Sequence, residues 1–105
     1  MYHIIWEYKV KPDCIFSFEA LYGAQGKWVK LFSKSKHYGS TDLLKRTDQP
    51  STYLTIDHWE TEQHYQAFLR DKKIAYTKVD DLGDAYTESE IKIGGYDDIE
   101  FGSKP

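Results

Sequence analysis

Residues 52–65, TYLTIDHWETEQHY, decide the fold of this chain. The first eight of them follow the period of two of a β-strand, which places Tyr53 and Trp59 on the same face. Thr61 then supplies a side-chain oxygen that can cap a helix, and Tyr65 begins an apolar stripe at helical spacing. The stretch is therefore predicted to be a strand that leads through a short junction into a helix.

A strand and an interrupted helix are predicted before this stretch. Residues 2–10 alternate along the chain as a half-buried strand does. A helix follows, because Pro12 fixes φ at its start and apolar residues then recur every three to four positions. Gly23 and Gly26 weaken its middle, so we expect a bend or break there before the helix ends near Ser33.

A hairpin and a second helix surround the deciding stretch. A weaker strand is predicted over 41–47, and its tight connection to the strand over 52–59 implies an antiparallel hairpin. The helix that follows is expected to break near 71–73, where its apolar stripe is interrupted, and to close at Gly83.

A last strand is predicted over 86–93, before a hinge at Gly94 and Gly95. The order strand, helix, strand, strand, helix, strand is that of an α+β, ferredoxin-like βαββαβ fold with one four-stranded antiparallel sheet. We expect a single domain over 1–96 and a polar C-terminal tail over 97–105.

The second face of the predicted sheet is also apolar. Ile5 in the first strand and Leu54 and Ile56 in the third lie opposite the face that the helices cover. An exposed apolar face of this kind needs a partner, and the same face of a second copy is the simplest one. The expected state is therefore a two-fold homodimer.

The composition excludes several classes of protein. The chain has 105 residues and a formal net charge of −3, and its charges are mixed, which argues against a phosphate-binding surface and so against nucleic acid. No apolar run approaches the roughly 20 residues of a membrane span. The first residues lack a basic leader and Cys14 stands alone, so we expect a cytoplasmic protein without disulfides.

Aromatic residues make up 16% of the chain, and so many rings either fill a core or line an apolar pocket. We expect a pocket between the sheet and the helices that holds a small apolar or aromatic ligand. The residues expected to bound it are Trp6, Tyr22, Trp28, Tyr53, Asp57, Trp59, Tyr65 and Phe68.

Three of these residues are candidates for catalysis. Tyr65 can give or take a proton at a phenol-like substrate, and Trp59 can stack on that substrate. Asp57 lies on the same strand face as Trp59, and a carboxylate among aromatic rings has a raised pKa and can act as a base. A structural interpretation stands beside each: the two rings as packing residues, and the carboxylate as a hydrogen-bond partner of the backbone or of a Tyr hydroxyl.

The sequence predicts neither a metal site nor a cofactor. Among the four histidines, His58 and His64 are six residues apart across a strand–helix junction, and no pair has the i, i+4 spacing of ligands on one helix. A glycine-rich phosphate loop, a nucleophile elbow and a dinucleotide fingerprint are all missing from the sequence.

Three motifs together resemble the antibiotic biosynthesis monooxygenase family over roughly residues 1–96. They are Trp6-Glu7-Tyr8, Trp28-Val29-Lys30-Leu31-Phe32 and the stretch from Tyr53 to Tyr65. Within the last, Trp59-Glu60-Thr61 and Tyr65 look like the family's Trp-Glu-Ser-x-x-x-Tyr junction between strand and helix. The resemblance implies that two ferredoxin-like domains pair as a dimeric α/β barrel.

The resemblance also implies an activity. Members that oxidise polycyclic aromatic polyketides without a cofactor use an Asn four residues before the Trp, the Trp, the Tyr, and an Arg later in the second helix. Trp59 and Tyr65 match, whereas Thr55 stands at the Asn position and no Arg lies between Asp71 and Asp84.

These matches and departures leave two functions open. The matches imply a cofactor-independent, monooxygenase-like enzyme for a small aromatic or polyphenolic substrate. The departures favour a non-catalytic ligand-binding or structural dimer of the same fold. Ligation of haem as in the haem-degrading relatives is not expected, because residues 71–84 contain no His.

Overall fold

The computed structural model describes residues 1–99. Its elements, in chain order, are β1 (Tyr2–Val10), the short 3-10 helix η1 (Pro12–Cys14), α1 (Ile15–Tyr22), α2 (Lys27–Phe32), β2 (Tyr38–Lys45), β3 (Thr52–Trp59), α3 (Glu62–Asp71), α4 (Lys73–Tyr86) and β4 (Thr87–Asp97). The predicted order of strands and helices is confirmed, and each of the two predicted helices is divided in two at the expected place.

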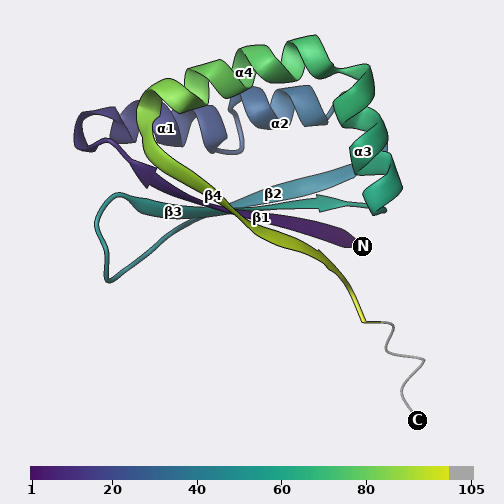
Figure 1. Cartoon of the computed structure of the whole chain (residues 1–105), viewed down its shortest axis with the longest axis horizontal. Coiled ribbons are helices and arrows are strands. Elements are labelled where there is room, and N and C mark those ends of the chain that lie inside the picture. Colours follow the sequence, from purple (N-terminus) through teal and green to yellow (C-terminus); the bar gives the residue numbers. More distant parts are fainter. Residues whose placement is uncertain (100–105) are drawn as a thin grey trace.

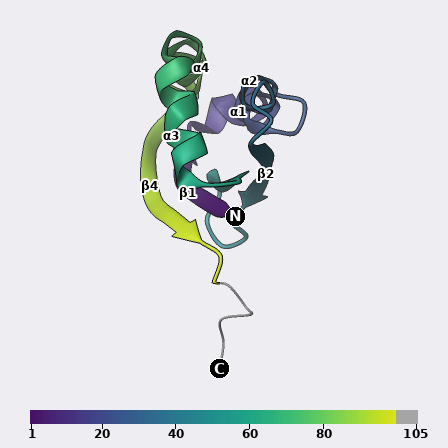
Figure 2. The ribbon, with the colours of Figure 1, turned by 90° about the vertical axis from the view of Figure 1, so that its right-hand side faces the viewer.

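The four strands form one antiparallel sheet in the order β2-β3-β1-β4. All helices lie over one face of this sheet and leave the other face open (Figure 1). Seen from the side, α3 and α4 stand beside β4, whereas α1 and α2 stand over β2 (Figure 2). This arrangement is the predicted α+β, ferredoxin-like fold.

The start of the second helix follows from a cap. Thr61 has an extended backbone, and its hydroxyl oxygen accepts a hydrogen bond of 3.1 Å from the backbone N–H of His64. The cap satisfies one of the free N–H groups of the first turn, so α3 begins directly after Trp59 leaves the sheet. Tyr65 and Phe68 then point into the core.

The sheet departs from the prediction at β2 and β4. β2 begins at Tyr38, because this residue already pairs with Trp59 at the end of β3. β4 continues to Asp97, so the expected hinge at Gly94 and Gly95 is wrong: both pair with β1 next to a bulge. A Cβ atom at Gly95 would lie 2.2 Å from the Tyr2 hydroxyl, which explains why glycine stands there.

The start of the predicted tail is therefore the end of a strand. The first tail residue, Asp97, closes β4. Residues 100–105, the rest of that predicted tail, lie outside the described part of the chain.

The core between sheet and helices is built largely of aromatic rings. Trp59 is completely buried and lies in edge contact with Phe32, Tyr38 and Tyr65. A second group of rings around Phe18 fills the other end of the same layer. Much of the aromatic content is thus explained by packing.

The open face of the sheet carries apolar side chains. Leu44 in β2 is 49% exposed, and in β4 Ile91 and Ile93 are 55% and 46% exposed. Ile5 and Ile56 pair across the two central strands and are half-buried. Across residues 1–99, no helix has the length and apolarity needed to cross a membrane.

Candidate functional site

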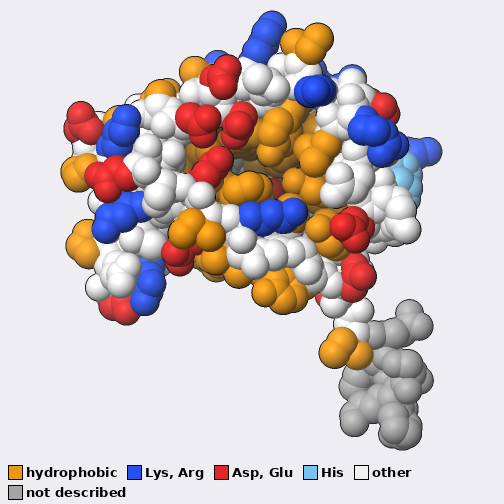
Figure 3. Space-filling view, in the orientation of Figure 1, with side chains coloured by type: hydrophobic (Ala, Val, Ile, Leu, Met, Phe, Trp, Pro, Cys, Tyr) orange, Lys and Arg blue, Asp and Glu red, His pale blue; other side chains and the backbone are white. Residues whose placement is uncertain are grey.

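A hollow opens between α4 and the sheet. Figure 3 shows apolar side chains in its depth, acidic side chains gathered to the left of its mouth and one basic side chain along its lower rim. Its lining comes from every strand and from α1, α2, α3 and α4: Trp6, Tyr8, Tyr22, Trp28, Phe32, Thr41, Thr55, Asp57, Tyr65, Tyr76, Asp80 and Glu90. The cavity volume is about 30 Å³, within a hollow of about 460 Å³ that includes its open mouth.

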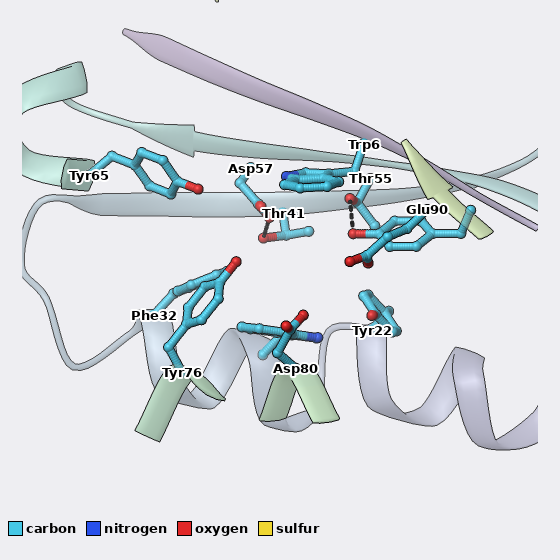
Figure 4. Close-up of a pocket in the computed structure, with 12 residues that line it drawn as sticks. Trp6, Tyr22, Phe32, Thr41, Thr55, Asp57, Tyr65, Tyr76, Asp80 and Glu90 are labelled. Atoms are coloured by element: carbon cyan, nitrogen blue, oxygen red, sulfur yellow. Dashed lines mark hydrogen bonds between the residues drawn. The ribbon is translucent and has the colours of Figure 1, made fainter. Parts of the chain in front are cut away.

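Asp57 forms the polar end of the hollow. The Thr41 hydroxyl donates a hydrogen bond of 2.6 Å to Asp57 Oδ1, and Thr41 in turn is 2.6 Å from the Tyr38 hydroxyl. Because Thr41 uses its proton on the carboxylate, Tyr38 donates to Thr41. This chain of hydroxyls fixes one carboxylate oxygen, and Figure 4 shows the Asp57 side chain directed into the hollow.

Burial makes Asp57 a weaker acid than usual. Loss of hydration raises the pKa of its carboxyl to about 6, against the smaller lowering effects of the Thr41 hydrogen bond and of nearby His58. A group with this pKa is mostly ionised at neutral pH and can still accept a proton. Asp57 therefore has the properties of a general base.

Two tyrosines face Asp57. Figure 4 shows the hydroxyls of Tyr65 and Tyr76 directed toward the Asp57–Thr41 pair. Burial raises the pKa of both phenols well above the ordinary value, and for Tyr65 the neighbouring Tyr76 and Asp57 raise it further. Both remain protonated at any physiological pH, so they can donate hydrogen bonds but cannot act as bases.

The other end of the hollow is acidic. Carboxylate oxygens of Asp80, Asp84 and Glu90 lie within 4.8 Å of one another. Burial, followed by mutual repulsion, raises the pKa of Asp80 and that of Glu90. Above them Thr55 donates a hydrogen bond of 3.3 Å to the Tyr8 hydroxyl.

The structure brings five of the eight predicted pocket residues to the hollow and leaves three outside its lining. Trp6, Tyr22, Trp28, Asp57 and Tyr65 line it. Trp59, Tyr53 and Phe68 lie instead in the packed core. Trp59 is buried in the core and contacts the ring of Tyr65, with ring centroids 5.6 Å apart, so it is not placed to stack on a ligand in the hollow. The Tyr53 hydroxyl donates to Glu19 on α1.

Several residues that line the hollow were not predicted, although the sequence pattern indicates the position of some of them. The same period of two that selected Trp6 and Asp57 also puts Tyr8 and Thr55 on the hollow face of their strands. Tyr76 and Asp80 are four residues apart and share one face of α4, but the rotation of that helix could not be inferred. Glu90 faces the hollow because it pairs with Tyr8, a register the sequence does not reveal.

The free space is smaller than expected. Ligand sites usually measure about 300 Å³ or more, whereas the cavity of about 30 Å³ holds a water-sized guest. An aromatic ligand therefore enters only if the walls of the hollow move apart. Trp6 is half-buried in this lining, and its strand β1 lies between β3 and β4.

A second polar cluster, outside the hollow, has the donor types that bind transition metals. His37 Nδ1 lies 3.2 Å from Glu60 Oε1, and the rings of His37 and His64 stack with centroids 3.6 Å apart. Two imidazoles and a carboxylate are a zinc-type set, but stacked rings direct their lone pairs in parallel rather than toward one point. The geometry does not form a closed metal site.

Comparisons with known proteins agree with this architecture. A family model described as antibiotic biosynthesis monooxygenase matches residues 1–75. This chain belongs to the antibiotic biosynthesis monooxygenase family. No curated protein matches it.

Solved structures of this family and fold superpose closely. SnoaB, a cofactor-independent oxygenase from Streptomyces nogalater, has a TM-score of 0.79 at 13% identity, covering 94% of this chain and 93% of its own. Candidate antibiotic biosynthesis monooxygenases from Bordetella bronchiseptica and Nitrosomonas europaea, each 18% identical, have TM-scores of 0.76 and 0.69. The former covers 94% of this chain and 97% of its own, the latter 95% and 100%. At these identities the likeness establishes the fold.

Membership of the family gives Thr55 a particular interest. It is the residue at the position for which the sequence resemblance implies an Asn, and it lines the hollow beside Tyr8, to whose hydroxyl it donates. The position thus keeps a small polar side chain that can donate a hydrogen bond, although a hydroxyl replaces the amide.

Proposed function

We propose that this protein is a homodimeric, cofactor-independent monooxygenase for a small, electron-rich aromatic substrate such as a polyphenol. The observation that carries the proposal is the buried Asp57 carboxylate, which faces an aromatic hollow and has a pKa of about 6. A base with this pKa, held in a largely apolar site, is suited to take a proton from a phenol or an activated ring carbon.

In the proposed reaction the substrate supplies all the electrons. Asp57 takes a proton from the substrate, and the resulting anion reacts with dioxygen directly. In an anthrone, the CH₂ carbon of the central ring becomes a C=O carbon with one atom of the dioxygen, and the other atom leaves as water with the two hydrogens of the CH₂ group. This carbon loses the four electrons that reduce the dioxygen. The aromatic walls hold the ring in place and keep bulk water away from the anion.

Tyr65 acts in this proposal as a neutral hydrogen-bond donor. Its raised pKa keeps the phenol protonated, so it can stabilise negative charge that develops on a substrate oxygen. Trp59, packed against its ring, is a positioning residue that holds the direction of the hydroxyl. This assignment gives Asp57 the role of base and gives the two other predicted catalytic residues different tasks.

Trp6, Tyr22 and Trp28 are the proposed substrate-binding residues, with Tyr53 and Phe68 supporting them from the core. The indole N–H of Trp28 is buried near the Tyr22 hydroxyl, but it makes no hydrogen bond of acceptable geometry within residues 1–99. A buried donor without a partner is destabilising. An oxygen atom of a bound substrate would satisfy it, which supports a ligand at this place.

The open face of the sheet supports the homodimer. Its exposed apolar side chains, Leu44, Ile91 and Ile93, lie opposite the hollow face. Pairing with the same face of a second copy would remove them from water. Sedimentation should give twice the chain mass, and Ile91→Glu should shift it toward the monomer. Ile74→Glu, on exposed α4, is the matched control and should leave the dimer intact.

Oxygen uptake by metal-stripped protein with a panel of anthrones and quinols tests the activity. We expect consumption above the buffer rate, and a loss of roughly 10² to 10⁴ in turnover for Asp57→Asn. Tyr65→Phe should lower turnover while leaving binding nearly unchanged. If no substrate consumes oxygen faster than buffer, or if Asp57→Asn is as active as the wild type, the enzymatic proposal is refuted.

The cavity volume favours one alternative, a non-catalytic ligand-binding or structural dimer. A space of about 30 Å³ excludes a ring unless the hollow opens. Thr55 in place of Asn removes one polar group that the resemblance links to oxygenation. Ligand binding without oxygen uptake, unaffected by Asp57→Asn, is the result expected of this alternative.

A further inference from the structure

The ionisable side chains of the hollow are acidic apart from its tyrosines. Asp57, Asp80 and Glu90 line it, and Asp84 adds a fourth carboxyl at its mouth. Within the described part of the chain, no Lys, Arg or His belongs to the lining. Lys92 pairs with Trp6 across β1 and β4, is exposed, and lies outside the lining.

The carboxyls repel one another. The oxygens of Asp80, Asp84 and Glu90 approach within 4.8 Å, and repulsion between them adds to burial in raising the pKa of Asp80 and Glu90. Across residues 1–99 none of the three has a salt-bridge partner. A positive charge placed between them would relieve the repulsion.

The walls beside the carboxyls are aromatic. Figure 4 shows the Asp80 and Glu90 carboxylates directed into a space bounded by Trp6, Tyr22 and Tyr76. The faces of such rings attract cations through their quadrupoles, most strongly where water is excluded. Carboxylates and aromatic faces together are the chemistry that recognises an organic ammonium group, and the same carboxylates repel an anion.

We propose that the hollow selects a cationic ligand: an arylalkylamine whose ammonium group lies between Asp80 and Glu90 and whose ring extends toward Asp57. The proposal rests on the proposed function, because it takes the same hollow as the substrate site. An ammonium head is about as large as a water molecule, so a cavity of about 30 Å³ accommodates it, whereas the attached ring requires the walls of the hollow to move apart. The three carboxylates are also an oxygen donor set that suits a divalent metal ion, so metal binding is the competing outcome of the test.

A cationic substrate also removes an electrostatic difficulty of the proposed reaction. Deprotonating a neutral phenol beside three carboxyl groups creates an anion among anions. If the substrate carries an ammonium group, loss of the ring proton leaves it a zwitterion with no net charge. The acidic end of the hollow then binds the substrate in both protonation states.

Calorimetric titration at pH 7.5 with three probes of similar shape tests the proposal. Phenethylammonium carries the positive charge, 2-phenylethanol is neutral, and 3-phenylpropionate is negative. We expect the ammonium to bind at least roughly tenfold more tightly than the alcohol, and the carboxylate to bind more weakly than either. Titrations with Mg²⁺ and Mn²⁺ form a separate arm.

Variants locate the charge that is recognised. Asp80→Asn and Glu90→Gln should each weaken the ammonium roughly tenfold and change the alcohol by less than about twofold. Glu88→Gln, the same substitution on the exposed part of β4, is the matched control and should change neither. Lys92→Met should leave ammonium binding unchanged or strengthen it.

Each outcome decides a different point. Equal binding of ammonium and alcohol overturns cation selection but leaves the hollow as a ligand site. If 3-phenylpropionate binds best and this binding is lost in Lys92→Met, the hollow selects an anionic ligand and the cation proposal is overturned. If Mn²⁺ binds tightly and this binding is lost in Asp80→Asn, the acidic end is a metal site and the proposal is overturned as well. If none of the probes binds at millimolar concentration, both the cation site and the ligand pocket are refuted. Ammonium binding without oxygen uptake supports the cation site and counts against the proposed enzyme.

Discussion

Replacing Asp57 by Asn tests whether burial of the ionised Asp57 carboxylate in the hollow lowers the stability of the folded protein. The side chain is 8% exposed, and burial raises its pKa from 3.8 to about 6. One pKa unit corresponds to about 1.4 kcal/mol, so ionised Asp57 lowers the free energy of unfolding by about 3 kcal/mol at neutral pH. Asn keeps the shape and the oxygen that accepts from Thr41. Asp57→Asn should therefore stabilise the protein by up to that amount.

The dependence on pH has a definite sign. Because the pKa of Asp57 is higher in the folded than in the unfolded protein, the folded state binds more protons between about pH 4 and pH 6. The contribution of Asp57 to stability consequently falls as the pH rises through this window and is constant above it. The difference between variant and wild type should be near zero below about pH 4 and largest above about pH 7.

Urea unfolding at fixed protein concentration, followed by tryptophan fluorescence, measures both effects. Asp81→Asn, at an exposed position on α4, is the control and should change the free energy of unfolding by less than about 0.5 kcal/mol at every pH. A variant that is no more stable than the wild type at pH 8, or a difference that does not shrink on acidification, would refute the burial of an ionised carboxylate at this place.

Two further substitutions test how the site is supported. Thr61→Ala removes the cap of α3 and should lower the free energy of unfolding by about 1 kcal/mol, whereas Thr77→Ala, on the exposed side of α4, should have little effect in the same denaturation assay. Gly83→Ala places a Cβ atom 2.2 Å from the Tyr22 hydroxyl and should destabilise by about 1 to 3 kcal/mol. Tyr22→Phe in the same chain removes the clashing oxygen, so failure of the double variant to regain stability would contradict this packing.

The fold was predictable because its signals are local. The alternation over residues 52–59 gives β3 with its observed bounds, and the glycines after Tyr22 mark the break between α1 and α2. The ends of β2 and β4 were not predictable, since they depend on pairing with distant residues. Tyr38 joins the sheet because it pairs with Trp59 on β3. Gly94 stays in the sheet because it pairs with Ile5 on β1.

The candidate site was predictable only where a strand's period of two decides which way a side chain points. Asp57 and Trp6 reach the hollow for that reason. Trp59 shares the face of Asp57, yet Phe32 and α3 cover it, which only the packing of helices on the sheet determines. The acidic end of the hollow was not predicted either, because Asp80 and Glu90 come together only through the packing of α4 beside β4.

Isotopically labelled dioxygen tests the central claim most directly. The metal-stripped protein is incubated with an anthrone or an amine-bearing polyphenol under labelled dioxygen, and the product is examined by mass spectrometry. We predict one labelled oxygen atom in each product molecule, formed at a rate that rises with pH through an apparent pKa of about 6 and that falls at least roughly a hundredfold in Asp57→Asn. Product without label, or labelled product formed equally well by Asp57→Asn, would contradict the account.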